Sequence, residues 1–142
     1  MEQSRQLAED LRAAVGHLVR STKHNSATMP AAEAAILGLL YRDGPQTIAE
    51  LAQARGVRHQ SAARTVKELT QAGLIATRPH PTDGRKLLVH VTPAGRAALE
   101  QDRHARADVL ADAIDKALTA CERDQLRRGV ELLVRLGTQM RS

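Results

Sequence analysis

Basic side chains gather in one stretch of the chain, and their chemistry suits a polyanion. Seven lysines and arginines lie between residues 55 and 86, against two acidic residues. The rest of the 142-residue chain is neutral, so this stretch holds the whole net charge of +5. Five of the seven are arginines. A localised basic segment is the electrostatic footprint of a nucleic-acid binder, and a solvated charged surface is the alternative.

Six histidines and one cysteine are the next candidates for chemistry. The histidines are scattered, and His17 and His24 are too far apart for a helical metal-binding pair. We therefore expect no metal site and no cofactor. Cys121 lies in the first turn of a predicted helix, where the dipole favours the thiolate, but Glu122 and Asp124 oppose this effect. An incidental thiol is favoured over a redox sensor.

The sequence shows no recognisable catalytic constellation. It has no nucleophile beside a base, no paired carboxylates in a catalytic setting and no glycine-rich phosphate loop. A single cysteine excludes an internal disulfide and a zinc site with four cysteine ligands. No apolar run approaches the roughly 20 residues of a membrane span, and the N-terminus is polar. We expect a cytoplasmic protein that is neither an enzyme nor bound to membranes.

Composition predicts that helices position the basic residues. The chain has 24 alanines and 18 leucines, which are strong helix formers. It has one tyrosine and no tryptophan or phenylalanine. The missing aromatics exclude a stacking platform for single-stranded nucleic acid. The expected fold class is mainly α (α+β).

Local signals divide the first half of the chain into four helices. Apolar spacing predicts helices over about 7–23 and 30–42, with a polar loop between them. A capping box at 47–50 begins a short helix that ends near Gly56. A fourth helix runs over about 59–72. The last two, joined by a tight turn, form a helix-turn-helix pattern.

In the second half of the chain, the spacing of apolar residues changes from a helical pattern to one typical of strands. Residues 74–78 and 86–91 are predicted strands, and a turn at 83–84 joins them into a hairpin with a basic tip. A helix of about 25 residues is expected over 92–118. A second capping box at 119–122 begins the last helix.

Five short segments carry a recognisable pattern. They are Thr47–Ala52, Arg64–Leu69, Gly73–Ile75, Asp83–Lys86 and Val91–Gly95. Together they resemble the MarR family of winged helix-turn-helix transcription regulators. The last two look like the family's wing pattern, D-x-R followed by a strand and L-T-x-x-G, with Val91 in place of the leucine. Length and helix order agree over the whole chain.

This resemblance implies a homodimeric regulator, usually a repressor, that binds pseudo-palindromic double-stranded DNA. Many members release DNA when a small-molecule effector binds between the dimer region and the DNA-binding lobe. Others respond to cysteine oxidation, through a cysteine in the N-terminal helix region where this chain has none. A regulator that responds to oxidation of Cys121 remains an alternative.

Amphipathic helices at both ends of the chain also favour a dimer. A chain this small would not bury all of their apolar stripes alone. Residues 1–28 and 95–142 are therefore predicted to form a helical dimerisation region. Residues 29–94 are predicted to form the winged helix-turn-helix lobe, with a two-stranded β wing.

The fourth helix is the expected recognition helix. A rotation of 100° per residue places Ala62, Val66 and Leu69 on one inward stripe. The N-terminal part of a recognition helix meets base edges, where glutamine can read adenine and arginine can read guanine. Arg58 stands where a capping residue is usual. The expected DNA contacts of this helix are Arg58, His59, Gln60, Ser61, Arg64, Thr65 and Lys67, with Lys67 on phosphate.

The hairpin tip is the second expected contact. Arg85 could enter a narrow minor groove, whose negative potential attracts arginine, and Asp83 could hold its guanidinium. A plain surface ion pair is the alternative. Lys86 and Arg78 are more generic phosphate candidates.

An effector pocket is expected between the first, second and fifth helices. Its lining would be mainly aliphatic, and its polar candidates are His17, Tyr41 and Arg42. A winged helix can also serve as a protein-interaction module without specific DNA binding. Confinement of the positive excess to the helix-turn-helix and the hairpin favours DNA.

Overall fold

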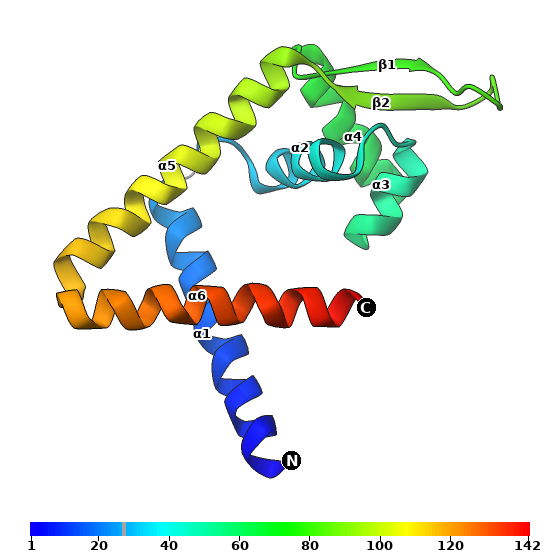
Figure 1. Cartoon of the computed structure of the whole chain (residues 1–142). Coiled ribbons are helices and arrows are strands. Elements are labelled where there is room, and N and C mark those ends of the chain that lie inside the picture. The colour runs from blue at the N-terminus through cyan, green and yellow to red at the C-terminus, as the bar shows by residue number, and fades with distance from the viewer. Residues whose placement is uncertain (27) are drawn as a thin grey trace. The chain divides into compact units, whose positions relative to one another are not determined.

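The computed structural model describes residues 1–26 and 28–142 of the chain, and these form six helices and one antiparallel sheet (Figure 1). The predicted fold class is confirmed. In chain order the elements are α1 (Glu2–Ser26), α2 (Ala31–Asp43), α3 (Ile48–Arg55), α4 (His59–Gln71), β1 (Ile75–Pro79), β2 (Leu87–Val91), α5 (Pro93–Ala117) and α6 (Ala120–Arg141).

Two compact units make up the chain, residues 1–106 and residues 107–142. The boundary falls inside the sequence of α5. None of the helices in the described part of the chain is long and apolar enough to cross a membrane.

One apolar core holds the first unit together. Its members come from three helices, both strands and the first half of α5. They are Ile36, Leu37, Leu40, Leu51, Val66, Leu69, Ile75, Val89 and Leu99. Burial of apolar surface contributes about 25 cal/mol per Å², so these side chains fix the positions of α2, α3 and α4 around the hairpin. The predicted inward stripe of the fourth helix is confirmed, because Ala62, Val66 and Leu69 are all buried.

Local signals set the ends of α3 and α4. The Thr47 hydroxyl accepts the Glu50 amide, and the Glu50 carboxylate accepts the Thr47 amide, which confirms the first capping box. Gly56 ends α3 in the left-handed conformation at φ 64°. α4 begins at His59, as predicted.

α1 continues to Ser26, three residues beyond its predicted end. The Asn25 side chain donates to the Ser21 carbonyl at 2.7 Å, one turn earlier in the same helix. Lys23 and His24 place basic groups at the negative end of the helix dipole. The predicted loop over 24–28 therefore begins later, and its residue 27 lies outside the described residues.

β1 and β2 pair in the register Ile75↔Val91 to Pro79↔Leu87, about one residue from the predicted strands. The segment before α3 adds one bridge that local sequence signals do not predict. The Val89 amide donates to the Gln46 carbonyl at 2.7 Å, and the Gln46 amide donates back at 3.1 Å. This bridge ties the hairpin to the connection between α2 and α3.

The start of α5 is anchored to the turn that follows α4. The Thr92 hydroxyl donates to the Gly73 carbonyl at 2.7 Å and accepts the Gly95 amide at 3.1 Å. A Cβ on Gly95 would lie 2.0 Å from the Leu74 carbonyl oxygen, so only glycine fits there. The T-x-x-G part of the sequence pattern thus has a structural cause.

α6 differs from the first unit because none of its described side chains is buried. Its large apolar residues are exposed, namely Leu126, Val130, Leu132, Leu133, Val134, Leu136 and Met140. α1 likewise exposes Leu7, Val15, Leu18 and Val19. The second predicted capping box is confirmed at Thr119 and Glu122.

Candidate nucleic-acid interface

α4 buries one face and exposes a polar, basic one. Gln60, Ser61, Arg64 and Lys67 are all exposed. The Arg64 side chain is 84% exposed and makes only a long contact, from Nε to Glu68 Oε1 at 3.4 Å. Such a contact at the surface contributes little to stability. This face is therefore available to a ligand outside the chain.

The first turn of α4 has no side-chain cap. Arg58 occupies the N-cap position in an extended conformation, and its exposed side chain makes no capping hydrogen bond. His59 follows it and is exposed as well. The residue expected to cap this helix thus leaves its guanidinium at the surface, beside the other predicted contacts.

Thr65 requires a correction. It is buried, with 7% of its surface exposed, and its hydroxyl donates to the Ser61 carbonyl at 3.2 Å. A side chain turned inward against the preceding turn of its own helix is not available to DNA. The prediction of a DNA contact at Thr65 is wrong for this reason.

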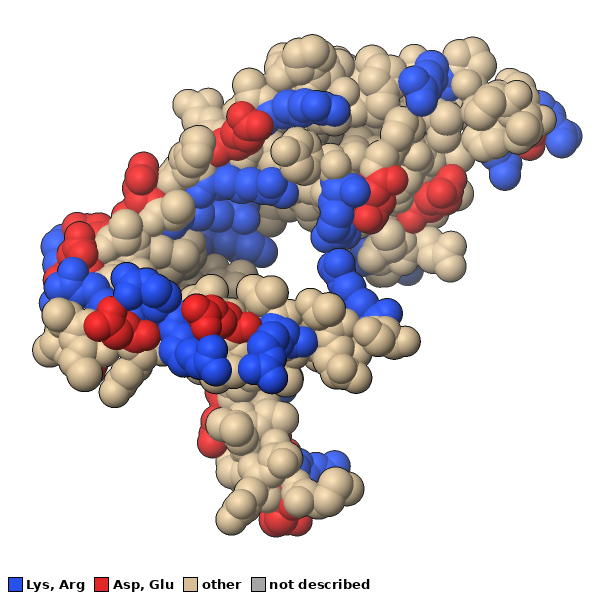
Figure 2. Space-filling model, viewed as in Figure 1, with Lys and Arg blue, Asp and Glu red and all other residues tan. Residues whose placement is uncertain are grey.

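The hairpin tip presents Arg85 outward. Its side chain is 93% exposed, and Asp83 Oδ1 accepts both its backbone amide at 3.1 Å and its Nε at 3.4 Å. Figure 2 shows basic side chains at this end of the molecule. Because an exposed ion pair adds little stability, its physical effect is on the direction of the guanidinium. Lys86 and Arg78 are exposed on the same hairpin.

A histidine that sequence reasoning missed closes the tip. His80 Nδ1 accepts the amides of Thr82 at 3.2 Å and of Asp83 at 3.1 Å. The available signal was its position two and three residues before those amides, which is the geometry of turns closed by a side-chain acceptor. Serine, asparagine or aspartate at that position would have been recognised.

A hollow of about 380 Å³ joins the two sets of predicted contacts. It is lined by Thr47, Ile48, Ala49, His59, Arg85, Lys86 and Leu87. His59 from α4 and the two basic residues of the hairpin thus border one concave surface. The residues from α3 and β2 were missed, because no local pattern reveals which first turn packs beside which strand.

Comparisons with known proteins agree with this geometry. The MarR family pattern matches residues 27–86. An HTH-type (helix-turn-helix) transcriptional regulator of Mycobacterium bovis is 32% identical over 138 residues, which are 96% of each chain. The chain belongs to the MarR family. The members of this family, like the Mycobacterium bovis relative, are transcription regulators rather than enzymes.

Solved structures place the whole chain on the family fold. A transcriptional regulator protein of Pseudomonas aeruginosa is 30% identical, with a TM-score of 0.83 over 97% of each chain. MarR of Escherichia coli in its apo form is 23% identical, with a TM-score of 0.64 over 90% of this chain and 94% of that one. The second likeness shows the fold alone.

The first unit of this MarR-family chain also contains a small hollow between α1, α2 and α5. It has a volume of about 170 Å³ and is lined by Lys23, Ala31, Ala34, Ala35, Gly38, Leu99, Arg103 and Arg106. Three of these side chains are basic. Local sequence signals missed this basic character because its charges come from helices far apart in the chain.

The three predicted effector contacts do not line this hollow. His17 is exposed on α1, and Arg42 pairs with Asp43 at 3.3 Å. The Tyr41 ring lies 5.1 Å from the guanidinium of Arg103 and 5.9 Å from that of Arg96. Small residues of α2 face this hollow instead, and the role of His17, Tyr41 and Arg42 as effector contacts stays a prediction.

A buried carboxylate lies beside the hollow. Asp102 is fully buried in α5. Its Oδ1 accepts the Thr28 hydroxyl at 2.6 Å, and its Oδ2 lies 2.6 Å from an Arg106 nitrogen. Pairing offsets the cost of burying the charge. The contact holds the segment before α2 against α5.

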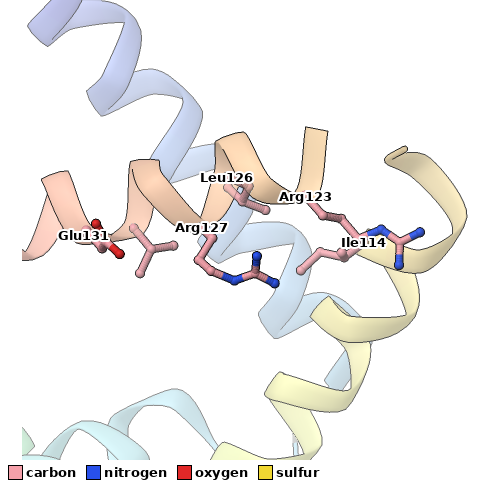
Figure 3. Close-up of a pocket in the computed structure, with 6 residues that line it drawn as sticks. Ile114, Arg123, Leu126, Arg127 and Glu131 are labelled. Atoms are coloured by element: carbon pink, nitrogen blue, oxygen red, sulfur yellow. The ribbon is translucent and has the colours of Figure 1, made fainter. Parts of the chain in front are cut away.

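The second unit has hollows of its own along α6. One of about 380 Å³ is lined by Ile114, Arg123, Leu126, Arg127, Val130 and Glu131 (Figure 3). Cys121 is exposed in the first turn of α6. Among the described residues, no group of three or more His, Cys, Asp and Glu lies together as a metal site would require.

Proposed function

We propose that this MarR-family regulator binds pseudo-palindromic double-stranded DNA as a homodimer. The observation that carries the proposal is the exposure of the chain's excess positive charge on α4 and the hairpin. Arg64 and Arg85 are 84% and 93% exposed, while the opposite face of α4 is buried in the core. Within the chain, these two side chains make only surface contacts, each at 3.4 Å to a nearby carboxylate.

Each contact has a distinct role in this proposal. Gln60, Ser61 and Arg64 lie in the first half of α4 and read base edges in the major groove. Arg85 enters the adjacent minor groove, whose negative potential attracts a guanidinium. The remaining basic residues neutralise phosphates and fix the register. They are Arg58, Lys67, Arg78 and Lys86, with His59 at the entry of α4.

The homodimer is supported by the unpartnered apolar surface of α1 and α6. A monomer rarely exposes so many large aliphatic side chains on two helices. We propose residues 1–28 and 95–142 as the dimerisation region and residues 29–94 as the DNA-binding lobe. A two-fold dimer presents two recognition helices, which explains why the DNA site would be pseudo-palindromic.

We further propose that the protein is a cytoplasmic repressor released by a small molecule. The hollow between α1, α2 and α5 supports an effector site. Lys23 and Arg103 suit an anionic effector, whereas Arg106 is already paired with Asp102. The small volume of the hollow and the alanines of α2 that line it suit a compact effector.

The first experiment measures binding to the DNA upstream of the protein's own coding region. Fluorescence anisotropy with excess non-specific DNA, repeated over a range of salt, separates specific from electrostatic binding. We expect selective binding with a steep salt dependence. Binding equal to that of random DNA would instead leave two explanations, an operator elsewhere or a protein-interaction module.

The wing is tested with a matched pair of variants. Arg85→Ala removes the proposed minor-groove contact, and we expect roughly 10- to 100-fold weaker binding. Arg42→Ala removes an exposed arginine that also pairs with a neighbouring aspartate, at 3.3 Å. Its effect should stay within about twofold. Equal affinities for the two variants would remove the wing from the mechanism.

A further inference from the structure

The turn at the hairpin tip is closed by a ring nitrogen. His80 Nδ1 has three polar neighbours, the amides of Thr82 and Asp83 at 3.2 and 3.1 Å and the Thr82 hydroxyl at 3.3 Å. An amide N–H can only donate. Nδ1 therefore has to present its lone pair, and the ring proton has to be on Nε2.

A chain of hydrogen bonds through Asp83 connects this ring to Arg85. The Asp83 carboxylate accepts the amide and Nε of Arg85, and the Asp83 carbonyl accepts the Lys86 amide at 3.0 Å. The Lys86 carbonyl in turn accepts the His80 amide at 3.0 Å. The Asp83 amide, bound to His80, thus fixes the residue whose carboxylate directs the guanidinium.

We infer that neutral His80 is a positioning residue that holds the wing arginine in its DNA-binding orientation, so that protonation of the ring weakens DNA binding. The inference rests on the proposed function, because it concerns the same interface. Protonation places a hydrogen on Nδ1, which then faces two N–H donors and loses both hydrogen bonds. Histidine side chains in general change charge between about pH 5 and 8, and this range sets the two pH values of the test.

Other charges at the tip act on the same equilibrium. These charges are Arg78, Arg85 and Lys86, which are positive, and Asp83, which is negative. His59 borders the hollow that Arg85 and Lys86 line, so it is a second ionisable side chain at this interface. A positive charge on either histidine attracts DNA phosphate, which strengthens binding as the pH falls. The experiment must therefore separate two opposite effects on DNA affinity, the attraction of phosphate and the loss of the hydrogen bonds that close the turn.

His80→Asn provides the separation. Asparagine offers an acceptor oxygen that closes the same kind of turn and does not titrate. His80→Ala offers no acceptor. His59 is present in every variant, so its contribution cancels when variants are compared at one pH.

Affinity for the selected DNA is measured at about pH 7.5 and about pH 5.5 at constant ionic strength. At the higher pH we expect the Asn variant to bind within about twofold of the wild type and the Ala variant roughly 3- to 10-fold more weakly. At the lower pH the affinity of the wild type should drop below that of the Asn variant and approach that of the Ala variant. The inference is overturned if the wild type binds DNA more tightly than the Asn variant at the lower pH. It is also overturned if the Ala variant binds as tightly as the wild type at the higher pH.

Nitrogen NMR of the His80 ring tests the same inference without DNA. We expect the Nε2–H tautomer at neutral pH, and amide shifts of Thr82, Asp83 and Arg85 that titrate together with the ring. An Nδ1–H tautomer, or amides that ignore the ring, contradicts the inference. Absence of selective DNA binding in every variant would contradict the proposed function instead, so the two failures are distinguishable.

Discussion

The lobe around α2, α3 and α4 and the C-terminal helix α6 are built from the same aliphatic residues, which they use in opposite ways. In the lobe, the apolar side chains of the core are at most 5% exposed. In α6, Val130 is 51% exposed and Val134 is 64% exposed. The lobe therefore completes its core within one chain, whereas α6 offers a surface that a second chain can cover.

Function follows the same division. The lobe needs a fixed geometry, because base edges and phosphates are read by side chains held in position. α6 needs an exposed apolar surface rather than a fixed arrangement of polar side chains, because its proposed role is to join two lobes. Substitutions that change packing should therefore lower the stability of the lobe, whereas substitutions in α6 should weaken the association of two chains.

The largest expected effect comes from a cavity in the core of the lobe. Leu37 is fully buried, and Leu37→Ala should lower the free energy of unfolding by about 2–5 kcal/mol. Leu87→Ala is the control, since Leu87 is 52% exposed in β2, and its effect should stay within about 0.5 kcal/mol. Urea denaturation followed by circular dichroism measures both. Equal losses would mean that the lobe core is not the stabilising element described here.

A smaller effect is expected where α5 meets the turn after α4. Gly95→Ala places a Cβ against the Leu74 carbonyl and should cost about 1–3 kcal/mol, although alanine favours helices. Gly38→Ala in α2 has open space around it and should instead stabilise by about 0.5–1 kcal/mol. Opposite signs in thermal denaturation would support the close approach. Stabilisation by both substitutions would contradict it.

The two capping boxes give the smallest effect and compare the regions directly. Thr47 is buried and Thr119 is exposed, so Thr47→Ala should cost about 1–2 kcal/mol and Thr119→Ala less. Hydrogen bonds from the Thr119 backbone and side chain lower the pKa of Glu122. A lowered carboxyl pKa contributes stability above the ordinary glutamate value and loses it as the pH falls through the lowered one.

The pH dependence separates the two boxes further. We expect the difference between wild type and Thr119→Ala to shrink in acid, as Glu122 becomes protonated. Urea titrations at neutral and acidic pH measure it. A difference that stays constant with pH would show that the Thr119 side chain does not act on the Glu122 carboxylate.

Features carried by neighbouring residues were predictable from the sequence. The capping boxes at Thr47 and Thr119, the end of α3 at Gly56 and the hairpin all depend on residues a few positions apart. The exposed arginines could be predicted because helical spacing assigns each residue of α4 to a face. Arg85 and Asp83 pair as predicted because they lie two residues apart.

Features that need two distant segments were not predictable. The bridge between Gln46 and Val89, the basic lining of the hollow and the contact between Thr28 and Asp102 join residues far apart in sequence. Thr65 was misassigned because a hydroxyl satisfied by its own helix makes a polar residue as buried as an apolar one. His80 was missed because its chemistry suggested a metal ligand or a charge, and its role as an acceptor appears only in the folded turn.

The most direct test of the difference between the lobe and α6 is the mass of the protein in solution. Sedimentation equilibrium at micromolar concentration should give twice the 15.4 kDa chain mass. Val130→Asp, which places a charge in the hollow of Figure 3, should shift that mass toward one chain. A wild-type protein that sediments as a single chain would contradict the proposal that a second copy covers the apolar face of α6.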